Sequence, residues 1–138
     1  MVDTLTPSQR SRLMSRVRQR GTAPERVVQA LLRRMHLRYR SHPRNLPGTP
    51  DLILRDFGVA IFVHGCFWHN HRACRRGALP ASNRNFWVPK IAGNVRRDRL
   101  TARQLRAAGW RVAIIWECQA RNEHRLTSRI RRITSHSD

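Results

Sequence analysis

Apolar residues first follow a helical spacing in the segment from residue 22 to residue 35. Thr22-Ala-Pro-Glu25 opens this segment as a capping box, in which the Thr22 and Glu25 side chains bond the free amides of a helix start. Apolar residues then recur every three or four positions, as on the buried face of a helix. They are Val27, Val28, Leu31, Leu32 and Met35. We therefore predict a helix here, with Glu25 in its first turn.

The following apolar segments are short and have the composition of strands. We predict strands at residues 37–41, 51–54 and 59–64. The last of these is continuously apolar, as expected of a strand that is buried on both faces. Residues 110–116, WRVAIIW, are predicted to form a second strand of this kind.

Two further helices are predicted, one before the last strand and one after it. A long helix covers about Val88 to Ala108 and ends at Gly109, because glycine is favoured after a helix end. A basic helix covers residues 122–133. This order of elements predicts an α/β fold in a single domain, residues 1–138, with one sheet covered by helices on both faces.

The amino-terminal segment is predicted to be a basic helix, from Thr6-Pro7 to near Gly21. It has little apolar surface and carries five arginines, which pair with phosphate, so we expect residues 1–20 to act as an arm that contacts DNA. Its basic residues are Arg10, Arg12, Arg16, Arg18 and Arg20.

The charge of the whole chain points to the same partner. Lys and Arg total 28 against 8 Asp and Glu, a formal net charge of +20. Nearly all of these basic residues are Arg, whose planar guanidinium pairs with phosphate through two hydrogen bonds. An excess this large predicts a nucleic-acid partner.

Other features of the sequence indicate where in the cell the protein acts. The longest apolar run, residues 58–68, is too short to span a membrane, and the amino terminus lacks the apolar core of a secretory signal. An odd number of cysteines, 3, argues against a disulfide framework and for a reducing compartment. We expect a cytoplasmic monomer without a membrane segment.

Cysteine and histidine residues gather between residues 66 and 74. Cys66, His69, His71 and Cys74 lie in this segment, and Cys118 follows the last predicted strand. Three thiolates and one imidazole make a tetrahedral zinc site of the structural kind. Such a site would hold an irregular loop that has no core of its own. By spacing alone, either histidine could be the fourth ligand.

Few residues could carry out acid–base chemistry on a phosphodiester. Asp51 follows a Pro-Gly-Thr-Pro turn at a predicted strand start, where its carboxylate could hold Mg²⁺. Glu25 could join it, although the capping box explains Glu25 taken alone. His64 and His69 flank the start of the metal loop and are candidates for the site. Asp98, on the long helix, is expected to be a half-buried partner of an arginine outside the site.

Two aromatic pairs, Phe67-Trp68 and Phe86-Trp87, stand beside polar and basic segments. Apolar side chains inserted between base steps kink DNA, and aromatic faces stack on bases. Core packing would explain each ring equally well, but the position beside the predicted metal loop favours contact with DNA.

Several linked motifs resemble those of the very-short-patch-repair (Vsr) mismatch endonucleases. The central one is IFVHGCFWH at residues 61–69, preceded by PGTPD at residues 47–51. Further motifs follow in the same order, and the resemblance spans about residues 10–121. They are Phe86-Trp87, Lys90-Ile91, Asn94-Val95, Gly109-Trp-Arg-Val and Trp116-Glu-Cys118.

The resemblance implies a restriction-endonuclease-like fold with a mixed sheet. It also implies a Mg²⁺-dependent nick on the 5′ side of the mismatched T in a T:G pair, which arises when 5-methylcytosine deaminates. Asp51 and the backbone carbonyl of Val63, where the best-known members carry Thr, would then hold Mg²⁺. His69 would be the general base or orient the water, with Glu25 as its acidic partner and His64 as a supporting residue.

The same resemblance supplies further roles. The expected partner is double-stranded DNA with a T:G mismatch, bound in the nucleoid, and the reaction could be linked to a cytosine-5 DNA methyltransferase. Zinc is assigned to Cys66, His71, Cys74 and Cys118, and a wedge that enters the base stack to Phe67, Trp68 and Trp87.

Two other functions fit parts of the pattern. A non-catalytic zinc-containing DNA- or RNA-binding protein explains the charge and the zinc, but it needs neither Asp51 nor His69 and would bind without Mg²⁺. A restriction-type nuclease with the same fold would cut DNA that has no mismatch. Only substrates with and without the mismatch separate it from a repair enzyme.

Overall fold

The computed structural model describes residues 23–66, residue 71 and residues 84–135. The predicted basic arm lies outside these residues, as do Phe67, Trp68, His69 and Cys74. The described elements are, in chain order, α2 (Ala23–Arg34), β1 (Arg40–Ser41), β2 (Leu52–Leu54), the 3-10 turn η1 (Arg55–Phe57), β3 (Val59–His64), α3 (Arg84–Ala107), β4 (Arg111–Trp116), α4 (Glu117–Ala120) and α5 (Glu123–Thr134).

The four strands that the structure describes form one mixed sheet in the order β1-β2-β3-β4. β2 pairs antiparallel with β1 and β3, whereas β3 pairs parallel with β4. In the parallel pair, His64 lies opposite Trp116 at the carboxyl ends of both strands. Leu52, at the start of β2, lies opposite Ile61 near the same end. The residues just before β2 and just after β3 and β4 therefore meet at one end of the sheet.

One face of the sheet packs against α2 and α5. Alternate residues of each strand point to this face, because successive side chains of a strand point to opposite sides. α2 contributes most of its predicted apolar stripe, but Val27 is exposed, and α5 contributes a stripe that the sequence analysis did not predict. The buried cluster contains Val28, Leu31, Leu32, Leu52, Leu54, Val59, Ile61, Ala113, Ile115, Ala120, Leu126, Ile130 and Ile133.

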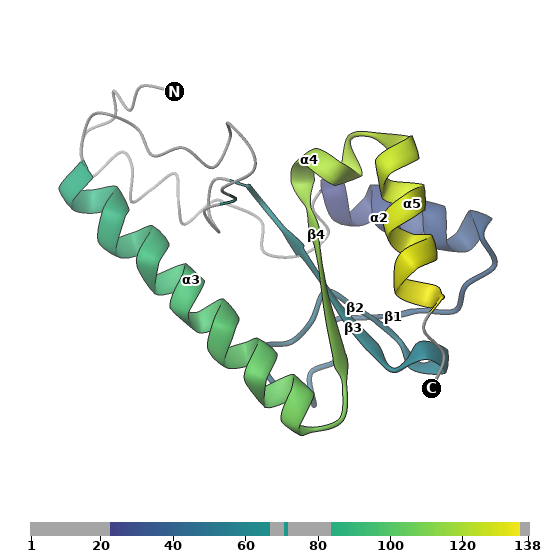
Figure 1. Cartoon of the computed structure of the whole chain (residues 1–138), viewed down its shortest axis with the longest axis horizontal. Helices are drawn as coiled ribbons and strands as arrows, with labels where there is room; N and C mark the ends of the chain where they lie inside the picture. Colours follow the sequence, from purple (N-terminus) through teal and green to yellow (C-terminus); the bar gives the residue numbers. More distant parts are fainter. Residues whose placement is uncertain (1–22, 67–70, 72–83, 136–138) are drawn as a thin grey trace.

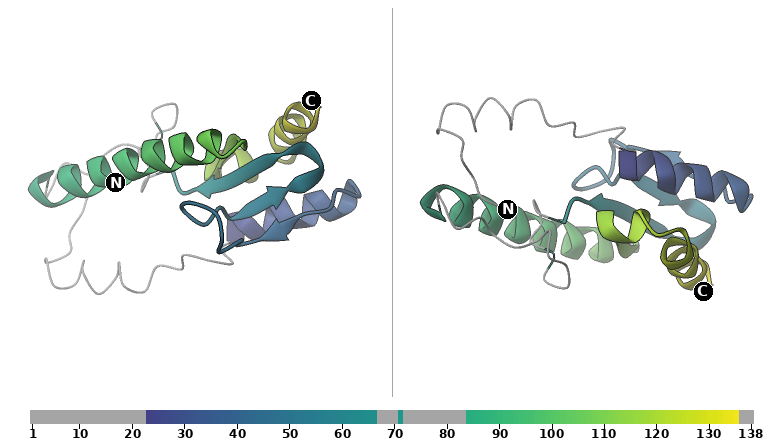
Figure 2. Two further views of the ribbon diagram at one scale, coloured as in Figure 1. Left: turned by 90° about the horizontal axis from the view of Figure 1, so that it is seen from below. Right: turned by 90° about the horizontal axis from the view of Figure 1, so that it is seen from above.

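α3 covers the opposite face, as Figure 1 shows. Its Leu105 is fully buried in a second cluster with Ile53 of β2 and Ala60 of β3. The amino-terminal part of α3 extends beyond the sheet (Figure 2). The predicted α/β fold, one sheet with helices on both faces, is thus confirmed. Within the described ranges, no helix is both long and apolar enough to cross a membrane.

The first predicted strand is shorter than expected. Of residues 37–41, only Arg40–Ser41 pair with β2. The preceding residues instead complete the end of α2, where His36 takes a left-handed φ of 57° and the Leu37 N–H donates to the Leu32 carbonyl at 2.9 Å. A helix end of this kind uses the amide that a longer strand would need.

The later helices lie close to their predicted positions. α3 begins at Arg84, earlier than the predicted start near Val88. Pro89 lies in the second turn of the helix, where its missing amide leaves the carbonyl of residue 85 without its usual helical donor. α5 begins as expected, with the Asn122 side chain accepting a hydrogen bond from the Arg125 N–H at 3.0 Å.

Candidate active site and metal centres

Two carboxylates come together at the end of the sheet where β2 starts. Asp51 precedes β2, and its Oδ2 accepts a hydrogen bond from the Val63 backbone N–H of β3 at 2.7 Å. Glu25 projects from the first turn of α2, is 2% exposed, and forms a side-chain hydrogen bond with Asp51. The burial of α2 against the sheet fixes this contact, because Glu25 lies one turn from Val28 on the same helix face.

The electrostatics of this pair favour a cation. Burial, followed by the hydrogen bond and negative charge of Glu25, raises the pKa of Asp51 from 3.8 to about 8, although the Val63 N–H opposes the shift. Ionisation of both carboxyl groups would be unfavourable, because two negative charges would lie close together and away from water. A divalent cation would remove that cost, and hard oxygen ligands suit Mg²⁺.

His42 lies beside the two carboxylates in the candidate site, although no sequence motif pointed to it. Its Nε2 lies 3.3 Å from Glu25 Oε2 and 3.9 Å from Asp51 Oδ1. Its backbone N–H donates to the Asp51 carbonyl at 3.1 Å, which continues the pairing of β1 with β2. A hairpin register would have placed residue 42 opposite residue 51. The ligand atoms of Glu25, His42 and Asp51 all lie within 4.8 Å of one another, so the three could hold a metal ion.

His64 lies at the end of β3 beside an unexpected partner. Its Nε2 is 3.9 Å from Oδ1 of Asp98 on α3, and both side chains are largely buried. We expected Asp98 to lie outside the site as the partner of an arginine. Its carboxylate faces a candidate site residue, because α3 packs across the face of the sheet from which His64 projects.

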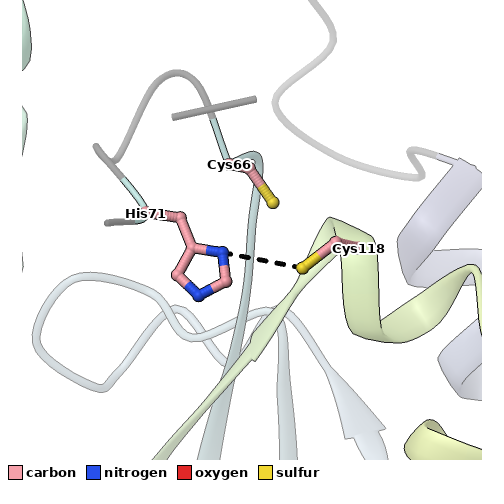
Figure 3. A group of neighbouring side chains, drawn as sticks. All are labelled: Cys66, His71 and Cys118. Carbon is pink, nitrogen blue, oxygen red and sulfur yellow. Dashed lines mark hydrogen bonds between the residues drawn. The ribbon is translucent and has the colours of Figure 1, made fainter. Parts of the chain in front are cut away.

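A second group joins Cys66, just after β3, with His71 and with Cys118 on α4. Figure 3 shows the three side chains pointing toward one another. The Sγ of Cys118 is 3.6 Å from Nδ1 of His71, and the His71 N–H donates to the Cys66 carbonyl at 2.9 Å. The ligand atoms of all three lie within 4.8 Å of one another.

The spacing and protonation of this group suit a metal. A sulfur and a nitrogen bound to one zinc ion lie about 3.5 Å apart at the tetrahedral angle. Burial, and then the positive charge of Arg125, lowers the pKa of His71 and favours the neutral imidazole that binds metals. The His71 ring also stacks on Trp116 at 4.1 Å, with an interplanar angle of 7°. Trp116 therefore supports the group, a role that the sequence did not suggest.

Comparison with known proteins identifies the family. The model of the DNA mismatch endonuclease Vsr family matches residues 2–76 of the 138. The DNA mismatch endonuclease Vsr of Escherichia coli is 40% identical over 127 residues, 92% of this chain and 81% of that protein. The chain belongs to the Vsr family of DNA mismatch endonucleases. It is therefore a DNA endonuclease.

Two further likenesses extend this finding. The type II nicking enzyme V.XorIIP of Xanthomonas oryzae pv. oryzae is 44% identical over 133 residues, 96% of this Vsr-family chain and 97% of that enzyme. The catalytic domain of the homing endonuclease I-Bth0305I is similar in fold, with a TM-score of 0.55 at 22% identity, covering 82% of this chain and 94% of the domain.

The Vsr-family chain has a basic cleft of about 620 Å³ beside Trp116, the residue that stacks on His71. It is lined by residues of α3, β4, α4 and α5, and none of these lining residues is acidic. Burial, and then Arg132, lowers the pKa of Arg129, so the guanidinium groups here repel one another and favour an anion. The lining includes Arg106, Arg125, Arg129, Arg132 and Trp116.

Trp87, a predicted wedge residue, is packed inward. It is 4% exposed, and its ring meets Phe86 edge-on with centroids 4.9 Å apart. To enter a base stack, this ring would have to turn outward when DNA binds. Its role as a wedge stays a prediction.

Proposed function

We propose that this Vsr-family enzyme nicks duplex DNA on the 5′ side of the mismatched T in a T:G pair and that the reaction requires Mg²⁺. The observation that carries the proposal is the buried Glu25–Asp51 pair, which is poised for a cation at the end of the sheet. The names of the relatives support a nick and a mismatch as substrate. The choice of a T:G pair as the mismatch rests on the resemblance of the sequence motifs to those of the Vsr enzymes.

The residues present fit Mg²⁺ as the catalytic metal. Asp51 and the backbone carbonyl of Val63 would hold it. The Val63 N–H points to Asp51, and the N–H and C=O of one residue in a strand point to the same neighbour. The Val63 carbonyl therefore faces the same side, and the side chain at this position need not take part. When bound, Mg²⁺ would supply a Lewis acid for the negative charge that develops on the phosphate.

Two histidines would take part in proton transfer. His69, which lies outside the described residues, is proposed as the general base or the group that orients water, with Glu25 as its acidic partner. His64 would support it from the end of β3. The Asp98 carboxylate, 3.9 Å from His64 Nε2, would hold that imidazole in place.

A zinc ion would fix the segment after β3, which contains His69. Cys66, His71 and Cys118 already lie at ligand spacing, and Cys74 would complete the tetrahedron. The zinc would hold the segment after β3 against α4 and thereby position the residues that follow His64.

DNA would lie across the basic surface of a monomer. The arginines of the cleft would bind phosphate, residues 1–20 would act as an arm, and Phe67, Trp68 and Trp87 would enter the stack beside the mismatch. A link to a cytosine-5 DNA methyltransferase follows from the substrate, since T:G pairs arise from 5-methylcytosine.

A nicking assay tests the proposal. End-labelled duplexes with T:G or matched T:A are incubated with and without Mg²⁺, using the wild type and Asp51→Asn. We expect single-strand cleavage of the T:G duplex only with Mg²⁺ and only by the wild type. Equal cleavage of both duplexes would instead favour a restriction-type nuclease, and binding without cleavage would favour a non-catalytic DNA-binding protein.

A further inference from the structure

The Nε2 atom of His42 faces the two carboxylates, but within the described part of the chain it forms no hydrogen bond. Its Nε2 is buried and finds no hydrogen-bond partner among the described residues. The 3.3 Å contact with Glu25 Oε2 therefore lacks the geometry of a hydrogen bond. A buried nitrogen without a hydrogen bond destabilises the fold by about 1–3 kcal/mol. A bound ion that coordinates this nitrogen would remove the penalty.

The distances around this nitrogen are those between ligands of one metal ion. Two ligand atoms with bonds of about 2.2 Å lie about 3.1 Å apart at 90° and about 3.8 Å apart at 120°. The Nε2 of His42 is 3.3 Å from Glu25 and 3.9 Å from Asp51. An ion between the three groups would thus meet all of them with little rearrangement.

The backbone holds His42 in this position. Residue 42 adopts a left-handed φ of 48°, a conformation in which His, Asn and Asp are found more often than most residues. Its N–H donates to the Asp51 carbonyl at 3.1 Å. The same hydrogen-bonded segment therefore carries both side chains, and His42 cannot drift away from Asp51 without breaking the hairpin.

We propose that His42 is a third protein ligand of the catalytic metal. The inference rests on the proposed function, which places the metal at Asp51 and the Val63 backbone carbonyl, beside Glu25. An imidazole nitrogen among carboxylate oxygens shifts the preference of the site from Mg²⁺, which favours oxygen, toward Mn²⁺, which binds both. The site then binds Mn²⁺ more tightly than Mg²⁺ and is filled by Mn²⁺ when both ions are present at equal concentration.

A different role for His42 makes the opposite prediction. A protonated His42 would act as a fixed positive charge that neutralises Glu25 and Asp51 in place of a metal. A divalent cation would then have to compete with it, and removal of the imidazole would strengthen metal binding.

The test is metal binding to the intact protein, measured by calorimetry with Mn²⁺ and with Mg²⁺, in the wild type and in His42→Asn. Asn tolerates the left-handed backbone, so the fold is retained. The matched control is His36→Asn. His36 is exposed, also has a left-handed φ of 57°, and follows the opposite end of the helix that carries Glu25.

We expect His42→Asn to weaken Mn²⁺ binding about tenfold or more, in line with loss of one ligand, and Mg²⁺ binding by less. The wild type with Mn²⁺ should show a nitrogen coupling in pulsed electron paramagnetic resonance that His42→Asn lacks and His36→Asn keeps. Unchanged or tighter Mn²⁺ binding in His42→Asn, or a nitrogen coupling that persists there, would overturn the proposal.

Nicking by the same preparations separates this inference from the proposed function. If the wild type binds Mn²⁺ through His42 but nicks no T:G duplex, the proposed function fails and the ligand assignment stands. If it nicks T:G duplexes while His42→Asn keeps wild-type affinity for both ions, only the ligand assignment fails.

Discussion

The Val63 backbone N–H holds the Asp51 carboxylate at 2.7 Å across the end of β2 and β3. The contact comes from the main chain, so it does not depend on the side chain at residue 63. Strand pairing therefore fixes the position of the Asp51 carboxylate. The parallel pairing of β3 with β4 in turn holds β3 in register.

Replacement of Val63 by Thr should therefore leave the enzyme active. We expect Mg²⁺ affinity and the single-turnover nicking rate of Val63→Thr to stay within about twofold of the wild type, because the main-chain groups are unchanged. The fold should lose about 1 kcal/mol from the half-buried hydroxyl. A tenfold change in rate would show that the side chain takes part in the reaction.

Asp51→Asn should abolish nicking yet stabilise the metal-free protein at high pH. The raised pKa means that Asp51 favours folding at low pH and that this contribution is lost as the pH rises from about 4 to about 8. At pH 8.5 the variant should exceed the wild type by about 2–4 kcal/mol, and near pH 4 the two should be equal.

This difference is measured by urea unfolding across the pH range in buffers without added Mg²⁺. A chelator is avoided because it would also remove zinc. Added Mg²⁺ should restore the stability of the wild type and leave Asp51→Asn unchanged. Parallel pH curves for the two proteins would contradict the assignment.

Asp98→Asn should slow the reaction without weakening DNA binding. Its carboxylate faces His64 at 3.9 Å, so its loss should let the imidazole reorient and lower the single-turnover rate about tenfold or more. The affinity for a T:G duplex should stay the same. Asp56→Asn is the control, since Asp56 pairs with Arg38 at the surface. A loss of affinity with an unchanged rate would place Asp98 in DNA binding.

His71→Ala should release zinc and destabilise the fold. We expect zinc content to fall from about one ion per chain to near zero, and the free energy of unfolding to drop by about 3 kcal/mol or more. His124→Ala, an exposed histidine on α5, should change neither quantity. Full zinc content in His71→Ala would mean that another histidine is the ligand.

The acidic residues illustrate how far the sequence could predict the site. Asp51 could be singled out as a candidate because it follows a turn and precedes a strand, which are local features. Glu25 matched a local capping pattern, so its contact with Asp51 could only emerge from the packing of α2 on the sheet. Asp98 was placed outside the site, because its distance from His64 depends on how α3 crosses the sheet.

The sequence alone determined the elements whose signals are local. Apolar spacing predicted α2, continuously apolar segments predicted β3 and β4, and the cysteines indicated a metal centre. The tertiary structure decided which side chains meet. Hairpin pairing sets His42 beside Asp51, and parallel pairing sets His64 beside Trp116. Such contacts join residues far apart in the chain or depend on strand register, and neither can be read from periodicity.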